Sequence, residues 1–201
     1  MRPRMALLPL LLTVAGCGSS SNDSATVVSG TIHQFGRSYS LDVKDAFFVR
    51  YQPASGPGGI ILYFSDRPGA CAAFQANPSA LLESSDNLFI ALANLVTLST
   101  SGPIAAGTYQ AETSSFLTGL VSVSIFRAED ASCTEQARAA AQAGSVTLTT
   151  APGATSGGRT VGTFDLSMAR SAGEPVDRLT GQFDLPECVF DATSSGPSTC
   201  Q

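Results

Sequence analysis

Short segments in which apolar and polar residues alternate are the feature that most constrains the fold of this chain. Three of them, at residues 144–150 (GSVTLTT), 161–168 (VGTFDLSM) and 178–185 (RLTGQFDL), place large apolar side chains at every second position. Because successive side chains of a strand point to opposite faces, this period produces one apolar and one polar face. Turn-forming residues fill the intervals between them. The sequence therefore predicts three consecutive antiparallel strands with one face in water.

Segments rich in strand-forming residues also occur earlier in the chain, at residues 27–33, 39–43, 46–51, 59–65, 107–110 and 120–127. Residues 59–65 (GIILYFS) are apolar enough for a central strand. Residues 88–98 (LFIALANLVTL) fit either a strand or a buried helix, and we favour the strand because Gly and Pro signals flank the run. Together these segments predict an all-β, mainly antiparallel domain, a β-sandwich or open barrel of about eight to ten strands.

Helix is expected only in short pieces. Residues 134–143 (TEQARAAAQA) begin with a capping threonine and an early acidic residue, are rich in alanine, and end before Gly144, which is the pattern of a capped helix. Shorter helical turns are expected at residues 70–75 and 78–84.

Composition and charge exclude several classes of partner. The 201 residues include 11 basic and 16 acidic side chains, for a net charge of −5, which argues against nucleic acids and anionic lipid headgroups. The single histidine, His33, and the lack of a Cys-x-x-Cys motif leave little material for a zinc site. We therefore expect no metal and no cofactor.

The N-terminus resembles the signal peptide of bacterial lipoproteins. Arg2 and Arg4 precede about ten apolar residues, too few to cross a bilayer as a helix. The sequence VAGC at residues 14–17 then matches the lipobox of that family, in which the cysteine thiol receives a diacylglycerol and the chain is cut just before it. The resemblance implies lipidation of Cys17 and removal of residues 1–16. The alternatives are an ordinary secretory signal with a coincidental cysteine and a buried N-terminal helix.

The same resemblance implies a location. Residues 17–26 would form a flexible polar tether, and two or three acyl chains would anchor the protein stably in a membrane. Lipoproteins that stay at the inner membrane usually carry Asp after the lipidated cysteine, whereas this chain has Gly18. The resemblance therefore implies an extracytoplasmic protein in the outer membrane of a Gram-negative bacterium.

Four cysteines remain beyond the lipobox: Cys71, Cys133, Cys188 and Cys200. An even number in an exported chain predicts two disulfides. Three connectivities are open, and we favour Cys71–Cys133 with Cys188–Cys200 because the last two lie close together in a turn-rich tail. A reactive thiol would need a nearby base, and the chain has a single histidine.

The C-terminal strand segments carry a second resemblance. The pattern GSVTLTT, GGRTVGTFDLSM and DRLTGQFDLPEC, within residues 144–188, is similar to the C-terminal signature of uncharacterised secreted bacterial lipoproteins. The resemblance implies a β-rich fold and a membrane anchor, and it brings no activity or catalytic residues. We expect the β-rich domain to span residues 27–192 and an irregular tail to span 193–201.

The chain lacks the common motifs of serine hydrolases, phosphate-binding loops, zinc proteases and EF-hands. His33 is the only conventional base for a serine hydrolase, and it fits a surface histidine equally well. The remaining material for catalysis consists of carboxylate pairs: Asp42 with Asp45, Asp165 with Asp184, and Glu187 with Asp191. Asp165 and Asp184 occupy similar places in neighbouring strand segments, and Asp177 could join them in a weak Ca²⁺ site. Each of these side chains also fits a solvated carboxylate that keeps the sheet soluble.

These observations predict a lipid-anchored cell-envelope lipoprotein with a non-catalytic binding, adhesion or structural role, attached to the membrane through its N-terminal lipid. The alternatives are an envelope hydrolase that uses carboxylates on the wet face of the sheet and a periplasmic ligand carrier. Acidic side chains with raised pKa values in a deep pocket would favour the hydrolase. A closed barrel with an apolar cavity would favour the carrier, and a broad apolar surface would favour protein binding.

Overall fold

The computed structural model describes residues 26–51, 58–77, 85–97, 100–111, 119–132, 134–171 and 173–189. These residues form one short helix, α1 (Ala70–Ala76), and twelve strands. The strands are β1 (Val27–Ser29), β2 (Ile32–Gln34), β3 (Arg37–Tyr39), β4 (Asp45–Tyr51), β5 (Gly59–Ser65), β6 (Asp86–Thr97), β7 (Thr100–Gly102), β8 (Gly107–Ala111), β9 (Gly119–Glu129), β10 (Glu135–Thr150), β11 (Arg159–Ala169) and β12 (Asp177–Pro186).

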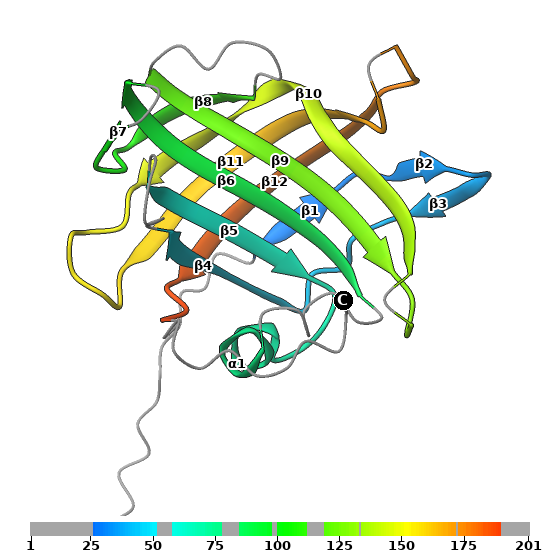
Figure 1. Ribbon diagram of the computed structural model, residues 1–201, viewed down its shortest axis with the longest axis horizontal. Helices are drawn as coiled ribbons and strands as arrows, with labels where there is room; N and C mark the ends of the chain where they lie inside the picture. Colours follow the sequence, from blue (N-terminus) through cyan, green and yellow to red (C-terminus); the bar gives the residue numbers. More distant parts are fainter. Residues whose placement is uncertain are drawn as a thin grey trace, which may run out of the picture.

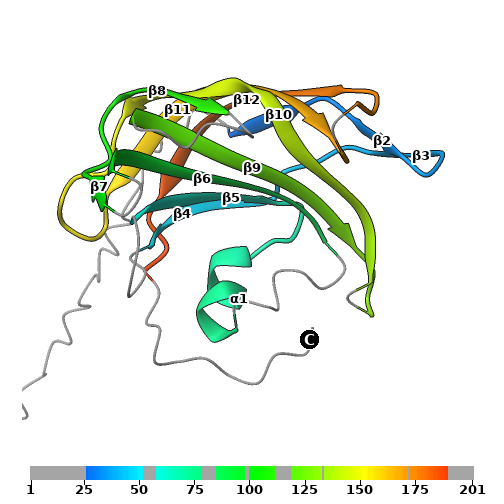
Figure 2. The same ribbon diagram turned by 45° about the horizontal axis from the view of Figure 1, so that its top comes forward.

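Ten strands form one mainly antiparallel sheet, in the order β1-β12-β11-β10-β8-β9-β6-β5-β4, with β7 paired to β6. Strands β2 and β3 form a separate hairpin. The sheet curls into a half-barrel, and α1 lies outside it beside β4 and β5 (Figures 1 and 2). The two ends of the sheet meet where Phe48 of β4 forms a parallel bridge with Glu187, the residue after β12. The predicted all-β class is confirmed.

The concave side of the sheet holds the main hydrophobic core. Every second side chain of β10, β11 and β12 is buried there, as at Val146, Phe164 and Phe183. Phe64 of β5 meets the rings of Phe164 and Phe183 across the curl, with centroids 5.7 and 5.9 Å from its own. The three strands pair consecutively and antiparallel, so the predicted meander with one apolar face is confirmed.

Several other predictions are confirmed. Residues 59–65 form β5, which lies between β4 and β6 inside the sheet. The apolar run predicted at residues 88–98 is strand β6 as far as Thr97 and is not a helix, and residue 98 lies outside the described residues. The helical turn expected at residues 70–75 is α1, whereas the one expected at 78–84 lies outside the described residues.

The helix predicted at residues 134–143 is wrong, because this segment forms the first part of β10. Its alanines alternate, with Ala137, Ala139 and Ala141 buried in the core. The segment pairs with β9, so interstrand hydrogen bonds and packing outweigh the intrinsic helix preference of alanine. Gly144 is not a helix end either: its φ is 116°, and a Cβ there would lie 2.1 Å from a carbonyl oxygen of β11.

Two of the predicted N-terminal strands are shorter than expected. Residues 27–33 divide into β1 and β2 at Gly30, whose φ is 124°. A Cβ at Gly30 would lie 2.2 Å from the backbone oxygen of Arg178, so the chain passes β12 at a distance that only glycine allows. The strand expected at residues 39–43 ends at Tyr39, the last residue of β3.

A second, smaller hydrophobic cluster lies on the convex side, between α1 and the sheet. Phe74 of α1 packs against Phe47 of β4 and Tyr63 of β5, with ring centroids 5.8 and 5.2 Å away. The rings of Phe47 and Tyr63 stack on each other at 5.0 Å. Burial in this cluster raises the pKa of Tyr63 to about 12.

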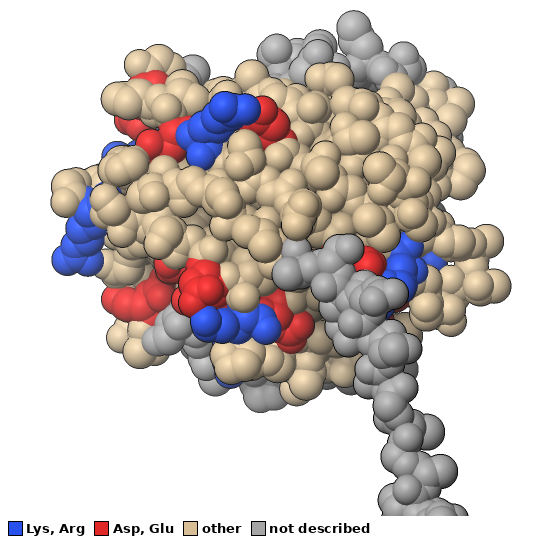
Figure 3. All heavy atoms as spheres, turned by 180° about the vertical axis from the view of Figure 1, so that it is seen from behind, with Lys and Arg blue, Asp and Glu red and all other residues tan. Residues whose placement is uncertain are grey.

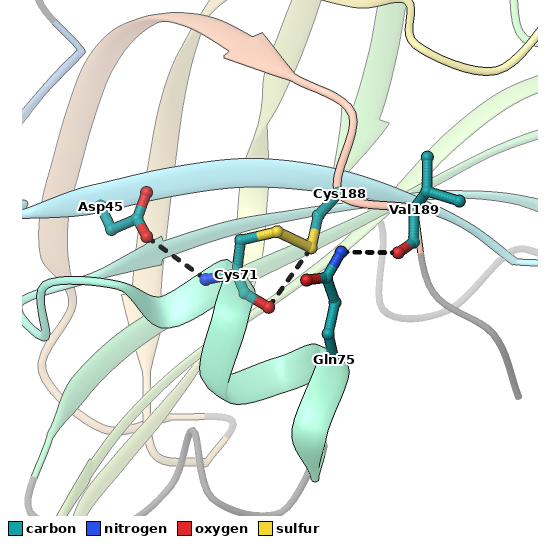
Figure 4. Close-up of a disulfide and its surroundings, with 5 residues drawn as sticks. All are labelled: Asp45, Cys71, Gln75, Cys188 and Val189. Carbon is teal, nitrogen blue, oxygen red and sulfur yellow. Dashed lines mark hydrogen bonds between the residues drawn. A yellow bond between two sulfur atoms is a disulfide. The ribbon is translucent and has the colours of Figure 1, made fainter. Parts of the chain in front are cut away.

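A disulfide joins α1 to the chain just after β12 (Figure 4). Cys71 and Cys188 have Cα atoms 5.8 Å apart and are 117 positions apart in the sequence. The backbone N–H of Cys188 donates to the carbonyl oxygen of Phe48 at 2.8 Å. The side-chain amide of Gln75 donates to the carbonyl oxygen of Val189 at 2.8 Å. The helix is therefore held to the point where the two ends of the sheet meet.

The favoured pairing of Cys71 with Cys133, and of Cys188 with Cys200, is therefore wrong. Closure of the sheet brings the end of β12 to β4, where α1 packs, so topology rather than sequence spacing selects the partner of Cys71. Cys17, Cys133 and Cys200 lie outside the described residues.

Candidate functional site

Strand β9 presents its valines to the outside and its serines to the core. Val123 is 43% exposed, whereas Ser122 and Ser124 are buried and their hydroxyl groups have no hydrogen-bond partner. The sequence predicts that Val121, Val123 and Ile125 share a face, and the structure shows that this is the convex face. An unpaired buried hydroxyl costs about 1–3 kcal/mol, whereas Phe126 and Ala128 on the same face of β9 are buried in the core and favour this orientation.

The convex side of the sheet is apolar around these valines. We define the apolar face by six residues of four strands: Tyr51, Ile61, Ala91, Ala93, Val121 and Val123. The convex side of β11 and β12 instead carries the polar side chains Thr163, Asp165 and Thr180, as expected of a strand face in water. The apolar face therefore contrasts with the polar convex side of β11 and β12.

A groove of about 220 Å³ lies on the apolar face. It forms where residues with little or no side chain, Gly58, Gly59 and Ala91, adjoin larger neighbours such as Tyr51 and Ile61. Gly59 lies directly opposite Tyr51 in the pairing of β4 with β5. The lining is almost wholly hydrocarbon, so the groove suits an apolar group of a partner and supplies no chemistry for a reaction.

A larger cleft of about 500 Å³ adjoins this groove and shares Tyr51 with it. Its charged residue is Arg50, whose Nε lies 2.8 Å from Oε1 of Glu187. The same guanidinium donates to the carbonyl oxygens of Gly153 at 2.7 Å and Thr155 at 3.0 Å. The charge of Arg50 is therefore used inside the protein to hold the wall of the cleft.

Glu187 is a structural carboxylate. Its side chain is 5% exposed, and it accepts hydrogen bonds from Arg50 and from the backbone N–H groups of Gly157 and Gly158. Burial acts to raise the pKa of Glu187, but these hydrogen bonds outweigh it, and the pKa lies below its ordinary value. Asp191, its expected partner, lies outside the described residues.

The structure does not bring Asp165 and Asp184 together. Asp165 lies opposite Thr180, four residues before Asp184 on β12, a separation of about 13 Å along the strand. Each carboxylate accepts instead from an arginine Nε at 2.8 Å, Asp165 from Arg178 and Asp184 from Arg159. Basic and acidic side chains lie next to one another in the view from behind (Figure 3). Asp165 and Asp184 therefore fit carboxylates on the solvent-facing side of the sheet that form ion pairs with arginines.

The other predicted carboxylate pair is also divided. Asp42 forms an ion pair with Lys44. Asp45 accepts a hydrogen bond from the backbone N–H of Cys71 at 3.2 Å, which helps to hold the start of α1 (Figure 4).

His33, the middle residue of β2, forms a contact with Asp177. His33 Nδ1 lies 2.8 Å from Asp177 Oδ1, and the backbone N–H of His33 donates to Asp177 Oδ2 at 2.7 Å. The imidazole is otherwise largely exposed, and the contact joins the hairpin to the start of β12. Asp177 is therefore not placed beside Asp165 and Asp184, and no group of three potential metal ligands gathers within the described ranges.

One acidic pair was not predicted from the sequence. Asp66 follows β5 and Asp86 begins β6, and the backbone N–H of Asp86 donates to the Asp66 carboxylate at 3.0 Å. Burial, and then the charge of Asp66, raise the pKa of Asp86 to about 6. The signal was available, because the two residues lie at facing ends of adjacent strands. Neither carboxylate lines the groove or the cleft.

Comparison with known proteins finds no matching family model, no matching curated protein and no matching solved structure. Among the described residues, no helix has both the length and the apolar character needed to cross a membrane.

Proposed function

We propose that this protein is a lipid-anchored cell-envelope lipoprotein whose β-domain binds a partner protein through the apolar face. The observation that carries the proposal is the orientation of β9. Two valines point outward while Ser122 and Ser124 are buried without hydrogen-bond partners. Phe126 and Ala128 lie on the same core-facing side as the serines, so β9 keeps its valines outside, and the apolar surface that they leave there favours a binding role.

Exposure and shape support the same role. Tyr51 is 51% exposed and Val123 is 43% exposed, and both line the apolar groove. A ring and a branched aliphatic side chain beside a hollow are typical of the centre of a protein interface. The domain contributes this surface without a catalytic group in the groove.

The membrane anchor is the second part of the proposal. The lipobox at residues 14–17 would attach the domain through lipid on Cys17, at the outer membrane, with residues 17–26 as the tether. The disulfide between Cys71 and Cys188 supports an extracytoplasmic location, because disulfides persist in oxidising compartments.

The two alternatives have less support. A hydrolase would need carboxylates beside a cleft, whereas Asp165 and Asp184 are apart and Asp86 lines neither the groove nor the cleft. A ligand carrier would need an apolar cavity inside the curl, where large side chains such as Phe64, Phe126 and Tyr109 pack into the core.

Site-specific photo-crosslinking in intact cells tests the binding role. A photoreactive residue at Val123 is expected to yield a discrete adduct with one protein, and the same residue at the exposed Thr163 of β11 is expected to yield none. Substituting Ala91 with Asp should abolish the Val123 adduct without lowering protein abundance. Crosslinking that is absent at Val123, or equal at both positions, would contradict the role of the apolar face.

A further inference from the structure

The β2–β3 hairpin carries an exposed aromatic ring at its tip. The hairpin extends away from the curled sheet (Figures 1 and 2), and its two strands are joined by the two-residue turn Phe35-Gly36. Phe35 is 67% exposed, more than any other large apolar side chain in the described ranges. The turn therefore exposes an apolar ring at the tip of the hairpin, the point farthest from Ile32 and Tyr39.

The backbone at this tip disfavours phenylalanine. Phe35 has φ 53° and Gly36 has φ 71°, the positive values that a type I′ turn requires at both central residues. Asn-Gly is the pair that suits such a turn, and a bulky residue at positive φ is uncommon. Phe35 is the one non-glycine residue with positive φ in the described part of the chain. Neither burial nor turn geometry accounts for the ring, so an external contact is its best explanation.

The residues of β2 just before the turn are fixed to the sheet. The side-chain amide of Gln34 donates to the carbonyl oxygen of Arg138 at 2.5 Å and accepts from its N–H at 3.0 Å. His33 is held by Asp177 through both its backbone and its ring. These hydrogen bonds fix the position of β2, and therefore of the turn that carries Phe35, relative to the sheet.

One arginine contacts the exposed ring, and a second comes directly after the turn in the sequence. The guanidinium carbon of Arg170, in the β11–β12 connection, lies 4.7 Å from the ring centroid of Phe35. Arg37 follows the turn directly and is exposed. Basic atoms are visible at the edge of the molecule that carries the hairpin (Figure 3). Although the chain as a whole is acidic, the tip itself combines an apolar ring with cations.

We propose that this tip inserts into the surface of a phospholipid bilayer, with Phe35 at the level of the headgroups and upper acyl chains. Guanidinium groups at the same depth contact lipid phosphates, which gives Arg170 and Arg37 a role beside the ring. One projecting side chain offers far less area than the roughly 800 Å² per partner of a stable protein interface. A bilayer, in contrast, accepts single side chains.

The position of the tip fits the proposed anchor, on which this orientation rests in part. From Cys17 to Thr26 the chain can span at most about 30 Å when extended, which keeps the domain near the membrane. The hairpin begins three residues after β1 in the sequence and lies beyond the Asp177 end of β12, whereas the tether enters the domain beside Asp184 of that strand. A lipid on Cys17 and the ring of Phe35 would give the domain two points of attachment and so a fixed orientation.

A tryptophan at the tip reports its insertion directly, because the natural chain contains no tryptophan. The Phe35→Trp protein, purified as the full protein, is placed in vesicles of phosphatidylcholine and phosphatidylglycerol in a two-to-one ratio. We expect its emission to shift to shorter wavelength and to be quenched by brominated acyl chains. Val96→Trp is the matched control, since Val96 is exposed near the end of β6, beside β7 and away from the hairpin (Figure 1).

The outcomes are distinct. Quenching of Trp at position 35 but not at position 96 supports insertion of the tip. Equal quenching at both positions, or no quenching at position 35, overturns the insertion of the tip. An emission shift that occurs with an added protein and without lipid would also overturn it, and would assign the tip to a protein partner. The mass of the protein reports separately whether Cys17 carries lipid, so failure of the anchor and failure of tip insertion are distinguishable.

Two further variants separate insertion from a structural role. Replacing Arg37 or Arg170 with Gln in the Phe35→Trp protein should lower the ratio of inserted to withdrawn tips about fivefold each, and only when phosphatidylglycerol is present. Phe35→Asn should leave resistance to unfolding unchanged or higher, because Asn-Gly suits the turn. A clear loss of stability in Phe35→Asn would mean that the ring serves the fold, and would overturn the proposal.

Discussion

Arg50 of β4 and Glu187, which lie 137 positions apart in the sequence, form an ion pair with 2.8 Å between Nε and Oε1. Glu187 also accepts hydrogen bonds from the backbone N–H groups of Gly157 at 2.9 Å and Gly158 at 3.2 Å. One buried carboxylate therefore ties together the edge strand β4, the end of β12 and the β10–β11 connection. The half-barrel closes here, beside the bridge between Phe48 and Glu187.

Glu187→Gln tests this closure. The substitution keeps the size of the side chain but leaves Arg50 without its counter-charge, and we expect the free energy of unfolding at neutral pH to fall by about 2 kcal/mol. Because the pKa of Glu187 is lowered in the fold, its contribution is present at neutral pH and is lost as the pH falls through that pKa. The difference between the two proteins should therefore vanish in acid. Arg178→Gln, at an exposed ion pair, serves as control, and an equally large effect there would contradict the assignment.

The Cys71–Cys188 disulfide should be a major contributor to stability. It closes a long loop, and its removal in the double variant Cys71→Ala, Cys188→Ala should lower the free energy of unfolding by about 2–4 kcal/mol. Thermal unfolding with and without reductant measures the effect. If the bridge has the expected role, a reductant destabilises the natural protein much more than the double variant. Equal sensitivity of the two proteins to reductant would argue against it.

The buried serines of β9 should reduce stability. Ser122→Ala and Ser124→Ala each remove a hydroxyl that has no hydrogen-bond partner, and we expect each to raise the free energy of unfolding by about 1 kcal/mol. Thr163→Ala, at an exposed position of β11, is the control and should change little. Destabilisation by either serine variant would show that its hydroxyl is hydrogen-bonded in the native protein.

Asp86 should make the protein more stable in mild acid. Its folded-state pKa of about 6 lies above the ordinary value, so the folded state binds the proton more tightly than the unfolded chain does. Stability therefore rises as the pH falls from 7 toward 4, by on the order of 1 kcal/mol once solvent screening at this half-buried site is considered. In Asp86→Asn this part of the pH dependence should be absent, whereas Asp42→Asn, at an exposed site, should retain it. Identical pH profiles for the natural protein and Asp86→Asn would contradict the role of this residue.

The alternating strands were predictable because their signal is local. In β10, β11 and β12 each large apolar residue, such as Val146 or Phe164, alternates with a polar one, so pairing and burial follow from the period alone. The first part of β10 shows the limit of that approach. Alanine is a small residue, so its alternation at residues 137, 139 and 141 is a weak strand signal, and its helix propensity dominates the sequence pattern. In the structure, pairing with β9 makes this segment a strand.

Features that depend on where distant segments meet could not be predicted. The period in β9 shows that Val121 and Val123 share a face, but only the assembled sheet determines which face lies outside. Likewise, the partner of Cys71 follows from closure of the half-barrel, and the separation of Asp165 from Asp184 follows from the register of β11 with β12. A connection between the strand segments 27–33 and 39–43 was predictable, but a two-residue turn at 35–36 was not, because those segments leave five residues between them and phenylalanine is unusual at such a turn.

Lipid anchoring of an extracytoplasmic domain can be tested by the intact mass of the native protein from the membrane fraction, alkylated before and after reduction. We expect the mass of residues 17–201 plus acyl chains, with Cys71 and Cys188 alkylated only after reduction. A chain that retains residues 1–16, or one that lacks acyl mass and has both thiols free, would contradict it.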